Sequence, residues 1–246
     1  MSSANTTEAR GGGGFPDTTW GMLTRIGDRA APEFRSGFET LCRRYWRPVY
    51  YAIRYGWGKS NEDAKDLTQA FFLWLLEGPS LEKYEHDRGS FRRYLKVLLG
   101  GFVGHHEEAK AALKRGGRAH MLDLDGQVVP FHEVLEDPRE SDPGRILDRA
   151  WVAQVIESAV AKTRAHLAEI GRELHFRVYE RYEMVAPDQR PTYAALASDL
   201  GLKETDVANY LFAVREMIRA EVRQELADTL QSADEIEDEW NALFGS

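Results

Sequence analysis

Apolar residues recur three and four positions apart along most of this chain, and this spacing restricts the fold more than any other feature. In the first such run the apolar positions are Phe38, Leu41, Cys42, Tyr45, Val49, Ile53 and Trp57. This spacing places side chains on one face of an α-helix, whereas a half-buried strand alternates apolar and polar residues. No such alternation persists in the sequence, so we expect an all-α fold.

Helix start and stop signals divide the pattern into separate helices. We expect Pro48 to kink the first helix, because proline removes a backbone donor and clashes with the preceding turn. Asn61 is a candidate N-cap of a second helix that ends at Gly78-Pro79, and Ser90 is a candidate cap of a third that stops at Gly116-Gly117. Helical spacing resumes at Ile146, continues through Leu167 and returns from Glu173 to Val185, and residues 186–191 are expected to form a loop.

Composition shifts predict five segments. Residues 1–18 are polar and glycine-rich and are expected to be a disordered leader. Residues 19–118 form a first helical domain, 119–143 an acidic linker with three prolines, and 144–230 a second helical domain. In residues 231–246 the apolar positions Ile236, Trp240, Leu243 and Phe244 predict an acidic amphipathic helix, which completes the second domain or docks on it and competes with phosphate.

The charge is distributed unevenly. The net charge of −8 argues at first sight against a nucleic-acid partner, but residues 43–118 carry 15 Lys and Arg against 9 Asp and Glu. Because binding depends on the local field, a basic first domain remains compatible with DNA. The ordinary composition excludes collagen-like and disulfide-stapled classes, no stretch is apolar enough to cross a membrane, and the single Cys42 is expected in the core of a cytoplasmic protein.

The second domain contains two short apolar stripes that flank Gly201. Two helices joined by a short glycine-containing turn are typical of a helix-turn-helix, and an ordinary helical hairpin is the alternative. The outward residues of the second helix would meet base edges, namely Lys203, Thr205, Asp206 and Asn209. Arg215 and Arg219 would reach phosphates, as would Lys110, Lys114, Arg115 and Arg118 after the third helix.

The segment 61–72 carries three acids in its first half, Glu62, Asp63 and Asp66, and ends with two aromatic residues. It resembles the second region of bacterial RNA polymerase sigma factors, in particular the large-bodied two-domain members of the extracytoplasmic-function group. The segments 45–50, 88–95 and 113–117 resemble that group too. The resemblance covers Phe34 to about Arg118 and again Ile146 to Phe244, in the order of the family's two domains.

This resemblance implies a subunit that binds core RNA polymerase and directs promoter-specific initiation, without enzymatic activity or a cofactor. It implies that polymerase is bound by Glu62, Asp63, Asp66, Leu67, Gln69 and Phe72. It implies that the first domain captures the melted promoter element, with DNA contacts from Arg92, Arg93, Lys96 and His105. An anti-sigma factor or a Ser/Thr kinase is a further partner that it would allow, although we expect phosphate at Thr68 to add little to a patch that is already acidic.

Two other functions remain open from the sequence. The chain could be a helix-turn-helix regulator that acts without polymerase. Glu62 and Asp66, four residues apart on one helix face, could instead hold magnesium in an all-α nucleotide pyrophosphohydrolase, although that site needs a second acidic helix. A metal site at His105 and His106 is disfavoured, because adjacent helical residues point about 100° apart.

Overall fold

The computed structural model describes residues 34–84, 90–112 and 141–227, together with the single residues 32, 237, 240 and 241. All regular structure in these described ranges is helical, so the expected all-α fold is confirmed. The elements are α2 (Phe34–Tyr51), η1 (Ala52–Gly56), α3 (Asn61–Glu77), α4 (Phe91–Ala112), α5 (Pro143–Glu169), α6 (Glu173–Glu183), η4 (Pro187–Gln189), α7 (Tyr193–Leu200) and α8 (Glu204–Ala227).

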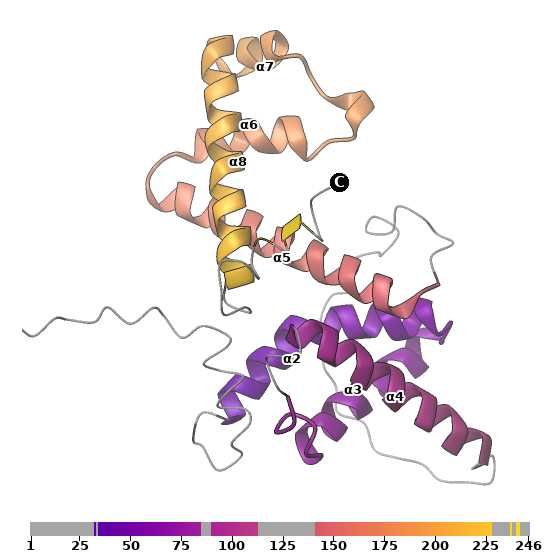
Figure 1. Cartoon of the computed structure of the whole chain (residues 1–246). Coiled ribbons are helices and arrows are strands. Elements are labelled where there is room, and N and C mark those ends of the chain that lie inside the picture. The colour runs from indigo at the N-terminus through magenta and orange to yellow at the C-terminus, as the bar shows by residue number, and fades with distance from the viewer. Residues whose placement is uncertain are drawn as a thin grey trace, which may run out of the picture.

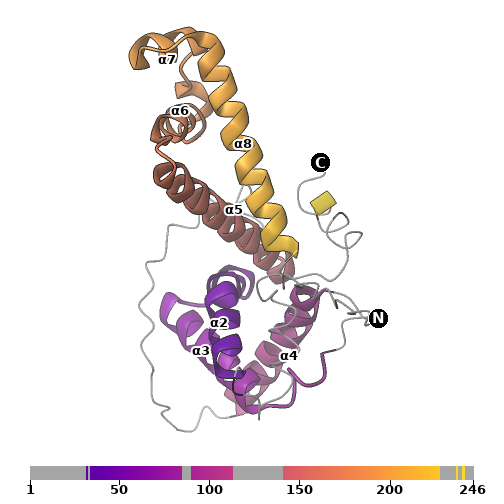
Figure 2. The same ribbon diagram turned by 90° about the vertical axis from the view of Figure 1, so that its left-hand side faces the viewer.

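The helices form two groups that α5 connects. Helices α2, α3 and α4 lie together at one end of the molecule, and α6, α7 and the start of α8 lie at the other (Figure 1). Helix α5 packs against α2 and η1 with its first half, and α8 runs beside its second half. The view turned by 90° shows α7 and the first turns of α8 at the end of the molecule farthest from α3 and α4 (Figure 2).

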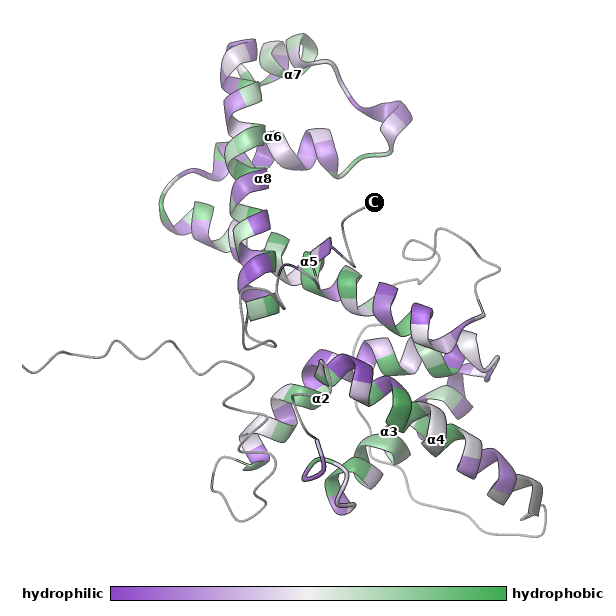
Figure 3. Ribbon diagram, in the orientation of Figure 1, coloured by the Kyte–Doolittle hydropathy of each residue, from purple (hydrophilic) through white to green (hydrophobic). Residues whose placement is uncertain are grey.

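One hydrophobic core extends from the first group of helices into α5 and the end of α8. Its fully buried side chains include Leu41, Phe71, Leu95, Ile146, Leu147 and Leu226. Figure 3 shows apolar positions recurring along these helices between hydrophilic ones, as the three-and-four spacing requires. The first half of α5 therefore shares its core with the helices that precede the predicted linker.

A smaller core holds the far end together. Val178 of α6, Leu196 and Ala197 of α7, and Val207 and Leu211 of α8 are buried against one another. Tyr182 and Tyr193 pack edge to face beside it, with ring centroids 5.1 Å apart. The short helix α7 is thus fixed to α8 by side-chain packing.

Helix starts follow the predicted signals with one shift. Ser60, and not Asn61, caps α3, and its hydroxyl accepts a hydrogen bond from the Asp63 amide at 3.0 Å. The Asn61 prediction was wrong by one residue because Asn61 already has helical geometry and accepts a hydrogen bond from the Tyr50 hydroxyl instead. Ser90 precedes α4 as expected, with its hydroxyl 3.4 Å from the Arg93 amide.

The start of α5 lies at the end of the predicted linker. The Asp142 carboxylate accepts hydrogen bonds from the amides of Gly144 and Arg145, and Pro143 is the first helical residue. Proline fits this position because its missing N–H has no partner in a first turn. Residue 143, the last residue of the predicted linker, therefore already belongs to α5.

Pro48 does not end the first helix. Helix α2 continues through it to Tyr51 and then changes to a π-helical turn, η1, which ends at Gly56. Cys42 is half-buried in α2, and burial raises the pKa of its thiol to about 12. The thiol is therefore protonated and unreactive at neutral pH.

Several predictions concern parts of the chain outside the described residues. These are the leader 1–18, residues 119–140 of the linker, and the tail positions Ile236, Leu243 and Phe244. Among the helices that the structure describes, none combines the length and apolar character needed to cross a membrane.

Candidate functional site

The acids predicted to bind polymerase lie at the start of α3. Glu62, Asp63 and Asp66 are exposed and form what we call the acidic surface. Asp63 also accepts a hydrogen bond of 2.8 Å from the Ser60 hydroxyl, so it closes the N-terminal cap of the helix. Negative charge is favourable here because the N-terminal end of a helix carries a partial positive charge.

The other residues predicted for this site are less accessible. Leu67 and Phe72 are buried in the main core, where Phe72 stacks on Trp46 with ring centroids 6.0 Å apart. Gln69 is half-buried, and Thr68 is fully buried with its hydroxyl donating to the Ala64 carbonyl at 2.7 Å. The three acids are therefore exposed on the surface of α3, whereas Leu67 and Phe72 pack in the main core.

Two basic residues predicted to contact DNA are paired with an acid of α5. Arg92 lies 3.1 Å and Lys96 2.7 Å from the carboxylate of Asp148. The Arg92 guanidinium also lies over the Trp151 ring, 4.6 Å from its centroid, and the residue is buried. In this arrangement Arg92 joins α4 to α5 and does not face solvent.

The rest of α4 presents a mixed surface. Arg93 and His105 are exposed, and His105 borders an apolar pocket of about 420 Å³ with Trp74 and Phe102. Lys110 lies near the end of α4, but its side chain and the residues Lys114, Arg115 and Arg118 fall outside the described part of the chain. The basic run that favoured phosphate contact therefore stays a prediction.

Helices α7 and α8 are joined by a tight turn at Gly201. Gly201 has φ of +66°, a left-handed conformation that favours glycine, and the Leu202 amide donates to the Ala197 carbonyl at 2.9 Å. The Thr192 hydroxyl caps α7 by accepting from the Ala195 amide at 3.2 Å. These caps and the small core fix the angle between the two helices.

The residues predicted to meet base edges divide into two sets. Lys203, Thr205 and Asn209 are exposed at the start of α8. Asp206 accepts a hydrogen bond of 3.2 Å from the Lys203 amide, so its carboxylate caps the helix. Asp206 thus has a local structural partner, whereas Thr205 and Asn209 point away from the buried face.

The two arginines predicted to reach phosphates have acidic partners. Arg215 is bonded to the carboxylate of Glu183 in α6, with Nε 2.9 Å from Oε1, and this hydrogen bond is the largest influence that raises the pKa of its guanidinium. Arg219 is bonded to Glu216 on its own helix. Each guanidinium would have to leave, or share, a carboxylate to contact DNA.

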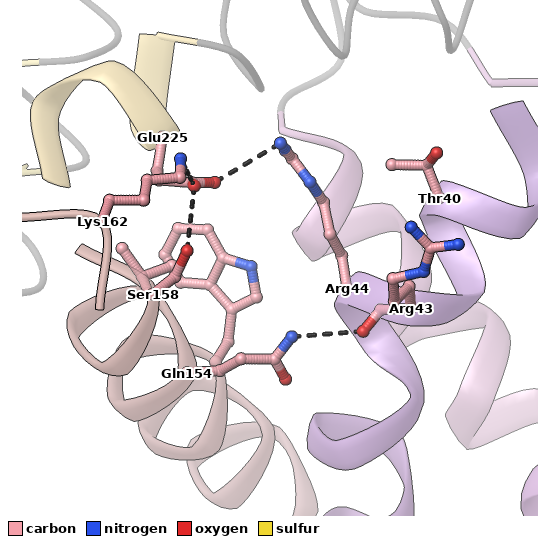
Figure 4. A pocket seen from close by; sticks show the side chains of 9 residues that line it. Thr40, Arg43, Arg44, Gln154, Ser158, Lys162 and Glu225 are labelled. Atoms are coloured by element: carbon pink, nitrogen blue, oxygen red, sulfur yellow. Dashed lines mark hydrogen bonds and ion pairs between the residues drawn. The ribbon is translucent and has the colours of Figure 1, made fainter. Parts of the chain in front are cut away.

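Several polar contacts connect α8 with α2 and α5 around Glu225, at the end of α8. They line a pocket of about 460 Å³ where α2, α5 and α8 meet (Figure 4). The Glu225 carboxylate contacts Lys162, the Ser158 hydroxyl at 3.2 Å and Arg44 at 3.4 Å. Burial alone would raise the pKa of Glu225, but the hydrogen bond from Lys162 and the charges of Arg44 and Lys162 together hold it below its usual value.

The two metal sites considered from the sequence are the one at Glu62 and Asp66 and the one at His105 and His106. Within the described ranges, no group of three or more His, Cys, Asp and Glu side chains is arranged to hold a metal ion. His105 lies 3.8 Å from Glu108 in an exposed pair.

In the tail, Trp240 packs against the main core, and the Arg223 guanidinium lies 4.8 Å from its ring centroid.

Phe212 is a surface residue that the sequence analysis did not single out. It lies on α8 and is 64% exposed, while Leu211 beside it is fully buried. Its position off the apolar stripe formed by Val207, Leu211 and Val214 is visible in the sequence and could have identified it.

Comparisons with protein-family models, with curated proteins and with solved structures found no match for this chain.

Proposed function

We propose that this chain is a sigma factor, a dissociable subunit that binds core RNA polymerase and selects the promoter. In this proposal the chain has two helical domains joined by the linker, and α7 and α8 form a DNA-binding helix-turn-helix. The observation that carries the proposal is that the chain exposes two separate polar surfaces. One is formed by the acids that begin α3, and the other by the outward polar residues that begin α8.

The acidic surface suits a basic protein partner. Glu62 and Asp66 project from a helix that the main core holds rigidly, and rigid, exposed charges favour fast and specific association with an oppositely charged surface. The start of α8 suits DNA, because it lies at an end of the molecule and carries short polar side chains of the kind that contact base edges. The protein would be cytoplasmic and would require no cofactor.

The test is co-purification with bacterial core RNA polymerase, followed by transcription from promoter DNA. Reversing Glu62 and Asp66 to Lys should weaken polymerase binding by several kcal/mol, because like charges then face each other across the interface. The cap residue Asp63 is left intact so that α3 still folds. A matched control reverses Glu169 and Asp188, which are also exposed, and should leave the affinity unchanged.

The outcomes separate the candidate functions. Equal polymerase affinity in both reversed variants and the parent chain would remove the acidic surface from the interface. Sequence-specific DNA binding without any polymerase dependence would favour a helix-turn-helix regulator. Release of pyrophosphate or phosphate from nucleotides with magnesium, abolished by Glu62→Gln, would favour the hydrolase.

A further inference from the structure

Phe212 belongs to a group of exposed residues on one face of α8. A single exposed apolar side chain is ordinary on a protein surface. On α8, however, Phe212 shares one face with Thr205 and Asn209, which precede it by seven and three residues. Spacings of four and three place these side chains above one another, and Ala208 lies at the edge of the same face. We call these four exposed residues the outward face of α8.

The outward face of α8 is accessible to a large partner. The buried side of α8 is occupied by Val207, Leu211 and Val214, so the helix orientation is fixed by the core. Helix α7 and the first turns of α8 lie at the end of the molecule, away from α2, α3 and α4 (Figure 2). A helix presented in this way has the dimensions that the major groove of DNA accepts.

The chemistry of the outward face matches one kind of base pair. An asparagine amide can bond adenine at both N6 and N7, whereas the methyl of threonine, alanine and the phenylalanine ring make apolar contact with the 5-methyl of thymine. Asn209 supplies the amide, and Thr205, Ala208 and Phe212 supply the apolar contacts. The Asn209 amide and the apolar groups of the other three residues thus suit A·T pairs, while the Thr205 hydroxyl can bond either kind of pair.

The side chains that could read guanine or cytosine lie at the border of this face or are already paired. Guanine is read mainly by arginine or lysine; no residue from Glu204 to Ala213 is either, and the exposed Lys203 lies in the turn that precedes α8. Arg215 is held by Glu183 of α6. Glu204, which could accept from cytosine, borders the outward face: it lies four residues before Ala208 and about 100° from Thr205 around the helix axis.

We propose that the outward face of α8 selects A·T pairs in the upstream promoter element, and that Phe212 does so by packing on a thymine methyl. Asn209 bonds the adenine of a pair in the same groove. This inference rests on the proposed function, because it assigns a sequence preference to a helix that must first enter DNA.

The experiment begins with the full-length chain bound to core RNA polymerase and a pool of duplex DNA of random sequence. Sequences enriched only when the chain is present define the upstream element, which should contain adjacent A·T pairs. The thymines of that element are then replaced by deoxyuridine, which lacks only the 5-methyl group. We expect binding to weaken about fourfold for each thymine methyl that packs on the helix, since burying one such carbon has an effect of that size.

A variant then assigns the contact to its residue. Phe212→Ala should bind the thymine and deoxyuridine probes more equally, because the side chain that distinguishes them is gone. Met184→Ala removes another exposed apolar side chain outside α8 and should keep the full preference for thymine.

Three results would contradict the inference. An enriched upstream element without A·T pairs, or equal binding of the two probes by the parent chain, overturns it while the sigma-factor proposal stands. An unchanged preference in Phe212→Ala overturns the role of that residue. Failure of the chain to enrich any sequence with polymerase overturns both the inference and the proposed function.

Discussion

At the scale of single residues, Thr68 is a polar side chain in an apolar core. It is fully buried in α3, and its hydroxyl satisfies its own hydrogen-bonding need at the Ala64 carbonyl. A kinase cannot reach this hydroxyl in the folded chain. Polymerase binding through the acidic surface should therefore not depend on phosphate at this position.

Two replacements of Thr68 should show how much a buried charge and how much a lost hydrogen bond each lower the free energy of unfolding. Thr68→Asp places an unpaired carboxylate in the core and should lower the free energy of unfolding by roughly 3 to 5 kcal/mol. Thr68→Val keeps the shape and should cost about 1 kcal/mol, since it removes only one hydrogen bond. Urea unfolding followed by circular dichroism measures both values. Equal costs would mean that the site is hydrated.

Glu225 gives the chain a pH-dependent contact. The pKa of this carboxyl is lower in the folded chain than its reference value of 4.5, so ionised Glu225 stabilises the fold. This stabilisation is complete above the unfolded pKa and disappears as pH falls through the lower folded pKa. The contact should therefore matter at neutral pH and weaken in acid below about pH 4.5.

The prediction is that Glu225→Gln lowers the free energy of unfolding by about 1 to 3 kcal/mol at pH 7 and by less at pH 3. Urea unfolding of both proteins at the two pH values checks it. Glu221→Gln is a suitable control, because Glu221 is more exposed and lies 3.9 Å from Lys162. A loss of stability that is the same at both pH values would contradict the assigned ionisation.

At the scale of elements, α4 contains three exposed glycines that packing does not require. A Cβ built at Gly100 or Gly104 meets no atom within 4 Å. Glycine loses more conformational freedom than alanine when a helix forms. Helix α4 is therefore less stable than its length and apolar stripe would allow.

Gly100→Ala and Gly104→Ala should each raise the free energy of unfolding by roughly 0.5 to 1 kcal/mol. Gly201→Ala should act in the opposite direction, because φ of +66° is unfavourable for alanine by about 1 kcal/mol or more. Thermal unfolding of the three variants gives the signs directly. Destabilisation by Gly100→Ala would show that α4 contacts something at that position.

At the scale of the whole molecule, the position of α5 depends on a close backbone approach. A Cβ at Gly56 would lie 2.6 Å from Cα of Pro143, which is too close for any side chain. This approach joins the end of η1 to the start of α5. Polar contacts such as Arg47 with Glu157, at 2.6 Å, continue the same seam between α2 and α5.

Gly56→Ala should therefore displace the start of α5 and lower the free energy of unfolding by about 1 to 3 kcal/mol, the usual cost of overpacking. Hydrogen exchange should become faster at buried amides in the first turns of α5, while α7 remains protected. Unchanged exchange in α5 would mean that η1 and Pro143 separate at no cost.

The sequence by itself determined the helices and the faces that they bury. Periodicity located α2 to α8, and the residues Ser90, Gly78 and Gly201 located helix ends, because these signals depend on neighbours within one or two turns. The same local rules placed Glu62 and Asp66 on the surface of α3, and Thr205 and Asn209 on the outside of α8.

Only the tertiary structure decided which charged residues remain accessible. Arg92 and Lys96 look like DNA-binding residues in the sequence, but Asp148 pairs with both across more than fifty positions of the chain. Arg44 and Glu225 likewise meet only when α8 packs beside α5 and α2. Helical periodicity assigns a residue to a face of its own helix. Which helix covers that face depends on long-range packing, and this packing fixed the partners of the charged residues.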